Sequence, residues 1–149
     1  MIANAPRRFI GDNLWMCSMD KGSGFKAAIG ARGEDVAVGF LVENGYNIIK
    51  RNYRCRYGEV DIIAEDGLTL AFIEVKTRGS ALFGAPQGSV DSRKQARIIR
   101  SACVYMEDEG IIDRYIRFDV VSVMRNKGRY TAEIFKGAFE AGDDTFSGA

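Results

Sequence analysis

The chain of 149 residues contains no histidine, and this absence removes several classes of active site. Histidine-based catalytic triads, zinc sites of the HExxH type and nucleases with histidine-bound metals all require the missing residue. Any catalytic chemistry must therefore be carried out by carboxylates and lysine, with or without a metal ion.

Cysteines and long apolar runs are also scarce. Cys17, Cys55 and Cys103 are far apart and form no CxxC pair, which argues against a disulfide framework or a zinc cluster. No stretch approaches the roughly 18 apolar residues of a membrane-spanning helix. The N-terminus lacks an apolar core followed by a small-residue cleavage site. We therefore expect a cytoplasmic protein without a membrane partner.

Length and local composition predict one domain with two irregular ends. Residues 1–25 show no apolar period and are expected to be irregular or mobile. Residues 26–139 carry all the periodic segments and form the predicted domain. Residues 140–149 are acidic and small, which is typical of a flexible tail. The net charge of +1 does not by itself indicate a nucleic-acid partner.

Periodicity predicts an α/β domain with a mixed central sheet flanked by helices. Ser89 or Asp91 can cap the second helix, which is expected to bury Ile99, Ala102, Cys103 and Met106. The expected elements are a helix over 26–44, strands over 46–55, 59–65 and 68–77, a loop over 78–88, a helix ending near 106, and strands over 117–124 and 129–135.

The second and third strands form a hairpin whose register can be estimated. The dipeptide Asp66-Gly67 favours a two-residue loop. With these two residues in the loop, Asp61 faces Phe72, and Asp61 and Glu74 become diagonal neighbours about 7–8 Å apart. Alternation places Glu59, Asp61, Glu74 and Lys76 on one face. The opposite face, with Val60, Ile62, Ala64, Ala71, Ile73 and Val75, is expected to be core.

Two acids and a lysine at this spacing can form a catalytic site. Carboxylate oxygens suit Mg²⁺, which needs only one or two protein carboxylates and keeps several waters. A lysine two residues along the strand can orient or deprotonate a metal-bound water, or stabilise charge on a phosphate. The simpler interpretation is a strand pair with solvated charges, because most charged residues on strands are exposed.

Two further acids lie near this group in the predicted fold. Glu34 projects about 60° from Ala37 and about 20° from Leu41 on the first helix, at the margin of the buried stripe. It is a candidate third acid, although an isolated acid at a helix margin is more often solvated. Glu59 is a possible accessory, since like charges at Glu59 and Glu74 require a cation between them.

Several short motifs carry a resemblance to a known family. Residues 58–64, 72–78, 83–84 and 117–120 resemble the bacterial YraN-like family, which is similar to archaeal Holliday-junction resolvases. The order of elements resembles the PD-(D/E)xK, or restriction-endonuclease-like, fold. The likeness runs from about Lys26 to Phe139. The proline of the motif is absent, and Glu59 takes the position two before Asp61.

The resemblance implies a function and a set of residues. In such nucleases the strand Asp and the Glu of ExK bind Mg²⁺, for which Mn²⁺ can substitute. By position these are Asp61 and Glu74, while Lys76 assists the attacking water and Glu34 completes the site. The implied activity is endonucleolytic hydrolysis of DNA, on branched or non-duplex structures. Resolution of a symmetric junction would require two sites and therefore a homodimer.

Basic residues flank the predicted acids and are candidates for DNA contact. Bare carboxylates repel phosphate, so the approach to them needs positive charge. We expect phosphate and shape recognition, because no base-reading pattern is evident. The candidates are Arg54, Arg56, Arg78, Lys94 and Arg97.

The residues leave alternatives to an enzyme. The chain can be a nucleic-acid-binding module that retains the nuclease fold without activity. It can also be a scaffold whose acids only pair with arginines. The four candidate residues together favour the enzyme, because a binding module does not need the Glu-x-Lys spacing.

Overall fold

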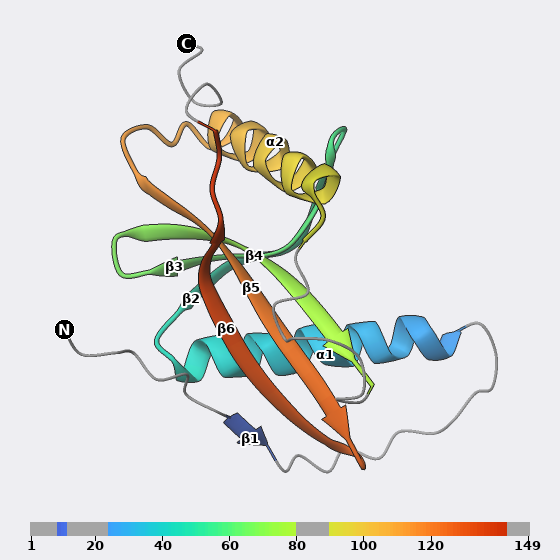
Figure 1. Cartoon of the computed structure of the whole chain (residues 1–149). Helices are drawn as coiled ribbons and strands as arrows, with labels where there is room; N and C mark the ends of the chain where they lie inside the picture. The colour runs from blue at the N-terminus through green and yellow to red at the C-terminus, as the bar shows by residue number, and fades with distance from the viewer. Residues whose placement is uncertain (1–8, 12–23, 80–89, 143–149) are drawn as a thin grey trace.

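A computed structural model describes residues 9–11, 24–79 and 90–142 (Figure 1). The predicted order of a helix, three strands, a helix and two strands is confirmed, and an additional short strand precedes it. The elements are β1 (Phe9–Gly11), α1 (Gly24–Glu43), β2 (Asn47–Cys55), β3 (Gly58–Asp66), β4 (Thr69–Arg78), α2 (Ser92–Asp108), β5 (Tyr115–Asn126) and β6 (Arg129–Phe139).

The strands form one mixed sheet in the order β1-β6-β5-β4-β3-β2. Only β4 and β5 are parallel, and α2 lies in the crossover that a parallel pair requires. The prediction of irregular structure throughout residues 1–25 is wrong at Phe9–Gly11, which pair with Ala132, Thr131 and Tyr130 of β6. A segment of three residues is too short to show the alternation of a strand. It is ordered by its pairing with the edge of β6.

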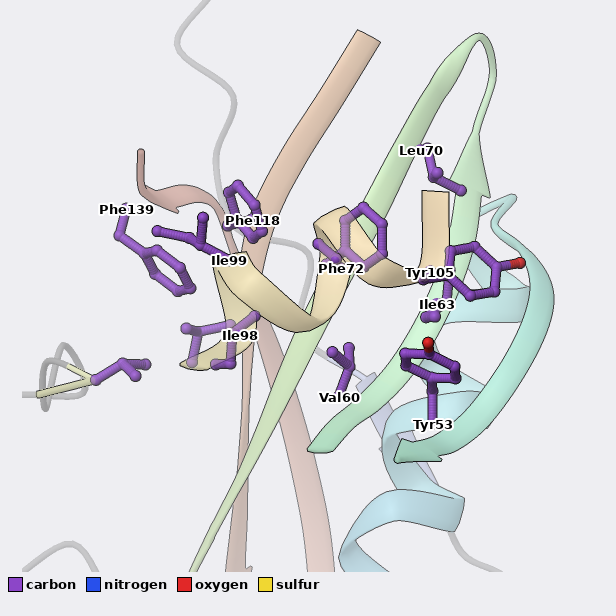
Figure 2. Packing of buried hydrophobic residues seen from close by; sticks show 13 residues of the cluster. Tyr53, Val60, Ile63, Leu70, Phe72, Ile98, Ile99, Tyr105, Phe118 and Phe139 are labelled. Carbon is purple, nitrogen blue, oxygen red and sulfur yellow. The ribbon is translucent and has the colours of Figure 1, made fainter. Parts of the chain in front are cut away.

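The two helices cover opposite faces of the sheet, and each covers an apolar cluster. Ala37, Phe40 and Leu41 of α1 pack with residues of β3, β4 and β5, and in Figure 1 α1 runs across β4, β5 and β6. The second cluster lies under α2, where Figure 2 shows Tyr105 beside Tyr53 of β2. No helix in the described part of the chain is long and apolar enough to cross a membrane.

Helix α2 begins after one of its two predicted N-cap residues. Asp91 is its N-cap and accepts a 2.9 Å hydrogen bond from the backbone N–H of Lys94, whereas Ser89 lies outside the described residues. Ile99 and Ala102 are buried as predicted. The predicted Cys103 and Met106 are only partly buried. Ile98, Ser101 and Tyr105 complete the buried face.

The β3–β4 hairpin has a different register from the predicted one. The loop is Gly67-Leu68, so Asp66 faces Thr69 and Ile62 faces Ile73. Gly67 has φ of 62° and Leu68 has no positive φ, which is the II′ turn with glycine at its first central position. The shift is two residues, and it therefore preserves the side-chain faces. Asp66 stays in the strand because its carboxylate binds cations from β5 and β6.

Alternation along β3 is interrupted near Asp61. Ile62 packs with the α1 cluster, but Val60, two residues away, packs with the α2 cluster. The expectation that Val60 shares a face with Ile62 is therefore wrong. Asn52 lies between the paired residues Arg51 and Tyr53 on β2 and has φ of 50°. This left-handed residue lies on β2 beside the point where the side chains of β3 change face.

An ion-pair network stabilises the other end of the sheet. The guanidinium of Arg117 contacts both oxygens of the fully buried Asp119 at 2.8 and 2.9 Å. It also donates to Asp66 at 2.7 Å and to the Tyr46 hydroxyl at 3.0 Å. Lys136 of β6 donates to Asp66 at 2.7 Å. Three strands are thereby joined through the Arg117-x-Asp119 motif, whose role is structural.

Helix α1 approaches β4 closely at Gly33. A Cβ atom placed on Gly33 would lie 1.8 Å from the Oγ1 of Thr77, far inside van der Waals contact. At Gly39, in the same helix, a Cβ would meet nothing within 4 Å. Glycine is therefore required at one position of α1 and not at the other.

We predict opposite effects for the two alanine substitutions. Gly33→Ala should lower the free energy of unfolding by about 1–3 kcal/mol, because the helix must move off Thr77. Gly39→Ala should raise it by up to about 1 kcal/mol through helix propensity. Urea unfolding of both variants tests this. Equal behaviour of the two would contradict the close approach of α1 and β4.

Candidate active site

Asp61 lies where the β3–β4 ladder ends. The last paired residues are Ile62 and Ile73, and one further step along this register brings Asp61 opposite Glu74. The Asp61 Oδ2 accepts a 2.8 Å hydrogen bond from the backbone N–H of Val75. The carboxylate therefore satisfies a backbone donor of β4 and is held beside Glu74.

Glu74 is a buried carboxylate on a central strand. Its exposed fraction is only 3 %. Oε1 forms an ion pair with Nζ of Lys94, in the first turn of α2. Oε2 is buried and has no hydrogen-bond partner among the described residues. A buried carboxylate oxygen without a donor is costly. This oxygen is consequently the position in the group that is most in need of a cation.

The two acids interact electrostatically. Burial and, second to it, the charge of Glu74 together raise the pKa of Asp61 to about 6. The Val75 N–H and the Lys94 ammonium act in the opposite direction. Lys94 also lies within the electrostatic range of Glu59. Asp61 and Glu74 are thus two repelling carboxylates, which we call the acidic pair, and Lys94 forms an ion pair with one of them, Glu74.

The structure places the other candidate residues, Lys76 and Glu34, on β4 and α1. Lys76 is two positions beyond Glu74 on β4, is partly buried and faces Ser122 of β5. Glu34 follows Gly33 on α1, which covers one face of the sheet, whereas Glu74 is paired with Lys94 of α2 on the other face. Among the described residues, no hydrogen bond or ion pair joins Glu34 to the acidic pair. Its contribution to the site stays a prediction.

Glu59 is already paired in this structure. Its Oε2 lies 3.1 Å from Nε of Arg54, across the β2–β3 ladder. Because this ion pair is largely exposed, it contributes little to stability. Glu59 therefore remains accessible as an accessory acid at the edge of the site.

The predicted DNA contacts fall into three arrangements. Lys94 binds Glu74, and Arg54 binds Glu59. Arg78 is the last residue of β4 and is partly buried. Arg56 and Arg97 are exposed and lie beside the β2–β3 turn. The position of Lys94 was not evident from the sequence, since a basic residue on a basic helix indicates a phosphate contact.

The donor set fits a hard divalent cation only in part. Asp61 and Glu74 offer carboxylate oxygens, and the unpartnered Oε2 of Glu74 is a ready ligand. In the described part of the chain, no three Asp, Glu, Cys or His side chains are grouped so that they could hold a metal ion. Two carboxylates with waters satisfy Mg²⁺, whereas a closed all-protein site is not formed.

The fold and the position of these side chains define a class of domain. A mixed sheet flanked by helices, with an Asp on one strand and Glu-x-Lys on its neighbour, has the restriction-endonuclease-like architecture.

The chain belongs to the family described as Uncharacterised protein family UPF0102, which matches residues 33–123. The resemblance to the YraN-like family is therefore confirmed. A UPF0102 protein of Moorella thermoacetica is 47 % identical over 112 residues, covering 74 % of this chain and 93 % of that protein. UPF0102 protein GSU0650 of Geobacter sulfurreducens is 47 % identical over 103 residues, covering 69 % and 80 %. A UPF0102 protein of Syntrophus aciditrophicus is 44 % identical over 111 residues, covering 74 % and 87 %.

We predict that Asp61→Asn stabilises the metal-free protein at neutral pH. A carboxyl whose pKa is raised on folding destabilises the folded state above that pKa, and the penalty disappears as pH falls from about 6 towards 4. The amide oxygen of Asn can still accept from Val75. Asp61→Asn should gain about 1–2 kcal/mol at pH 7.5 and almost nothing at pH 4. Urea unfolding in EDTA at both pH values tests this, and an equal gain at pH 4 would contradict it.

We predict that Lys94→Met destabilises the metal-free protein through Glu74. Removing the ammonium leaves a buried carboxylate without its cation, and the expected loss is about 1–3 kcal/mol. The loss should become much smaller in a Glu74→Gln background, which has no charge to compensate. Lys127→Met, at the exposed β5–β6 turn, is the matched control. A loss that is unchanged in the Glu74→Gln background would contradict the ion pair.

Proposed function

We propose that this protein is a Mg²⁺-dependent endonuclease that hydrolyses DNA phosphodiester bonds, on branched or otherwise non-duplex structures. The observation that carries the proposal is the acidic pair, in which Glu74 is buried and one of its oxygens has no partner among the described residues. Two carboxylates held together against their repulsion are expensive for a purely structural role. Membership of UPF0102 is compatible with this activity and does not specify it.

Each side chain of the site has a role in this proposal. Asp61 and Glu74 would hold the divalent cation, which when bound supplies a water of lowered pKa and neutralises phosphate charge. The Val75 N–H fixes the orientation of Asp61. Lys76 stands two positions along β4 from Glu74 and acts on the attacking water, as a base or as a cationic stabiliser. Glu34 completes the site from α1.

The basic residues provide the route for DNA. Arg54 and Arg56 precede β3, Arg78 ends β4, and Lys94 and Arg97 lie on the first turns of α2. Contacts to phosphate give affinity without sequence information, so structure-dependent binding follows from the shape of the surface. A junction with two-fold symmetry would need two copies of the site, and we propose a homodimer for that substrate.

A second function is supported by a specific observation. The Lys94 ammonium already neutralises Glu74, and a site neutralised by its own lysine can serve as a nucleic-acid-binding surface without metal. A binder and an enzyme therefore differ in whether divalent cations bind at the acidic pair. Calorimetric titration with Mn²⁺ separates them: the enzyme binds the metal and Asp61→Asn abolishes that binding.

The activity is tested with a panel of DNA substrates. Duplex, single-stranded, flap and four-way DNA should be incubated with the protein and Mg²⁺ or Mn²⁺. We expect cleavage of at least one structure, which Lys76→Met reduces by about 100-fold or more while retaining Mn²⁺ binding. Lys127→Met is again the control for an unrelated lysine. Full activity of Lys76→Met would contradict the assigned role, and metal binding without any cleavage would favour the binding module.

A further inference from the structure

The β2–β3 turn carries a second group of basic side chains beside the acidic pair. The turn residues are Arg56 and Tyr57. The guanidinium carbon of Arg56 lies 4.8 Å from the centre of the Tyr57 ring, and that of Arg100 lies 6.0 Å from it. Arg97 is the third member, because a Cβ on Gly58 would lie 3.4 Å from the Cβ of Arg97. We call Arg56, Arg97 and Arg100 with Tyr57 the turn cluster.

The turn is fixed on α2 and is not a free loop end. Cys55 donates a 3.3 Å hydrogen bond from its thiol to the hydroxyl of Ser101, which is completely buried in α2. Gly58 has φ of 153° and leaves room for Arg97. Because Arg56 of the turn and Arg100 of α2 meet around the same ring, and the stem of Arg97 lies beside Gly58, the cluster has a defined geometry before any ligand binds.

The charge of the turn cluster is uncompensated. Among the described residues, no carboxylate forms an ion pair with Arg56, Arg97 or Arg100, while the neighbouring Arg54 is paired with Glu59. The guanidinium groups of Arg56 and Arg100, which lie near the same ring, repel each other. Cation–π contact with Tyr57 offsets part of this repulsion and reduces the freedom of two side chains. A bound anion would offset the remaining repulsion between the guanidinium groups.

We propose that the turn cluster is a phosphate-binding subsite for a nucleic-acid strand, with Tyr57 as the residue that positions Arg56 and Arg100. The inference rests on the proposed function and deepens it by assigning the residues that hold the strand beside the acids. A guanidinium group can donate two parallel hydrogen bonds to the oxygens of one phosphate. An arginine therefore fixes the orientation of a phosphate, whereas a lysine acts as a point charge. The subsite takes backbone phosphate irrespective of base.

The position of the cluster suits a strand that reaches the acidic pair. Gly58 at the turn is three residues before Asp61 on β3, roughly 10 Å along an extended strand. This is about three base steps of a duplex. A phosphate held by the turn cluster would therefore lie only a few nucleotides from a bond placed at the acids.

Binding measurements in EDTA test the subsite without requiring cleavage. Fluorescently labelled duplex and four-way DNA of unrelated sequences should be titrated with the full chain at several salt concentrations. We expect Arg56→Ala and Arg100→Ala each to lower affinity about five- to tenfold at low salt and to reduce the salt slope by about one. Arg129→Ala, an exposed arginine at the start of β6, is the matched control and should change neither.

Substitutions of Tyr57 test its positioning role. Tyr57→Leu should lower affinity although no charge is removed, whereas Tyr57→Phe should bind as the wild type does. The effect of Tyr57→Leu should vanish in an Arg56→Ala/Arg100→Ala background, because there are no guanidiniums left to position. A loss that persists in that background, and is larger for single-stranded DNA, indicates base stacking on the ring and overturns the phosphate subsite.

The experiments can refute the phosphate subsite and the nuclease activity independently of each other. Normal DNA affinity in Arg56→Ala and Arg100→Ala, or an equal loss in Arg129→Ala, overturns the subsite even if the wild type cleaves DNA. Reduced affinity and salt slope in the first two variants support the subsite even if no substrate is cleaved. Circular dichroism of each variant establishes that the fold is retained.

Discussion

The repulsion between Asp61 and Glu74 is the constraint around which the site is built. Glu74 is almost completely buried on a central strand, and Asp61 is held next to it by the Val75 N–H. A protein gains no stability from two adjacent carboxylates in a region of low polarity unless a cation is present. In this structure Lys94 supplies the cation from the first turn of α2. A divalent ion bound at Asp61 and Glu74 would change this balance between the two carboxylates and Lys94.

The remainder of the fold keeps these two carboxylates together. The α1 contact at Gly33 and Thr77 fixes the end of β4, and the Arg117–Asp119 network fixes β3, β5 and β6 at the opposite end of the sheet. With both ends held, β3 can diverge from β4 at Asp61 without loss of the sheet. The open end of the ladder is where backbone groups and carboxylates become available to a ligand.

The charges outside the acidic pair differ in whether an acid compensates them. Arg54 is balanced by Glu59, and Lys94 by Glu74, but the arginines around Tyr57 have no acid within the described residues. An uncompensated cluster beside a compensated one gives a gradient of potential along β3. A polyanion would be oriented by this gradient before it reached the acids.

The sequence by itself determined the element order, two candidate N-caps of which Asp91 is one, and the shared face of Asp61 and Glu74. These follow from local periods and from strand alternation, which an even register shift does not change. Only the tertiary structure decided the loop at Gly67-Leu68, the strand at Phe9–Gly11 and the pairing of Lys94 with Glu74. Asp66 stays in its strand because Arg117 and Lys136, about 50 and 70 residues away in the chain, bind it. Contacts between distant residues carry no local signal, so a single sequence cannot reveal them.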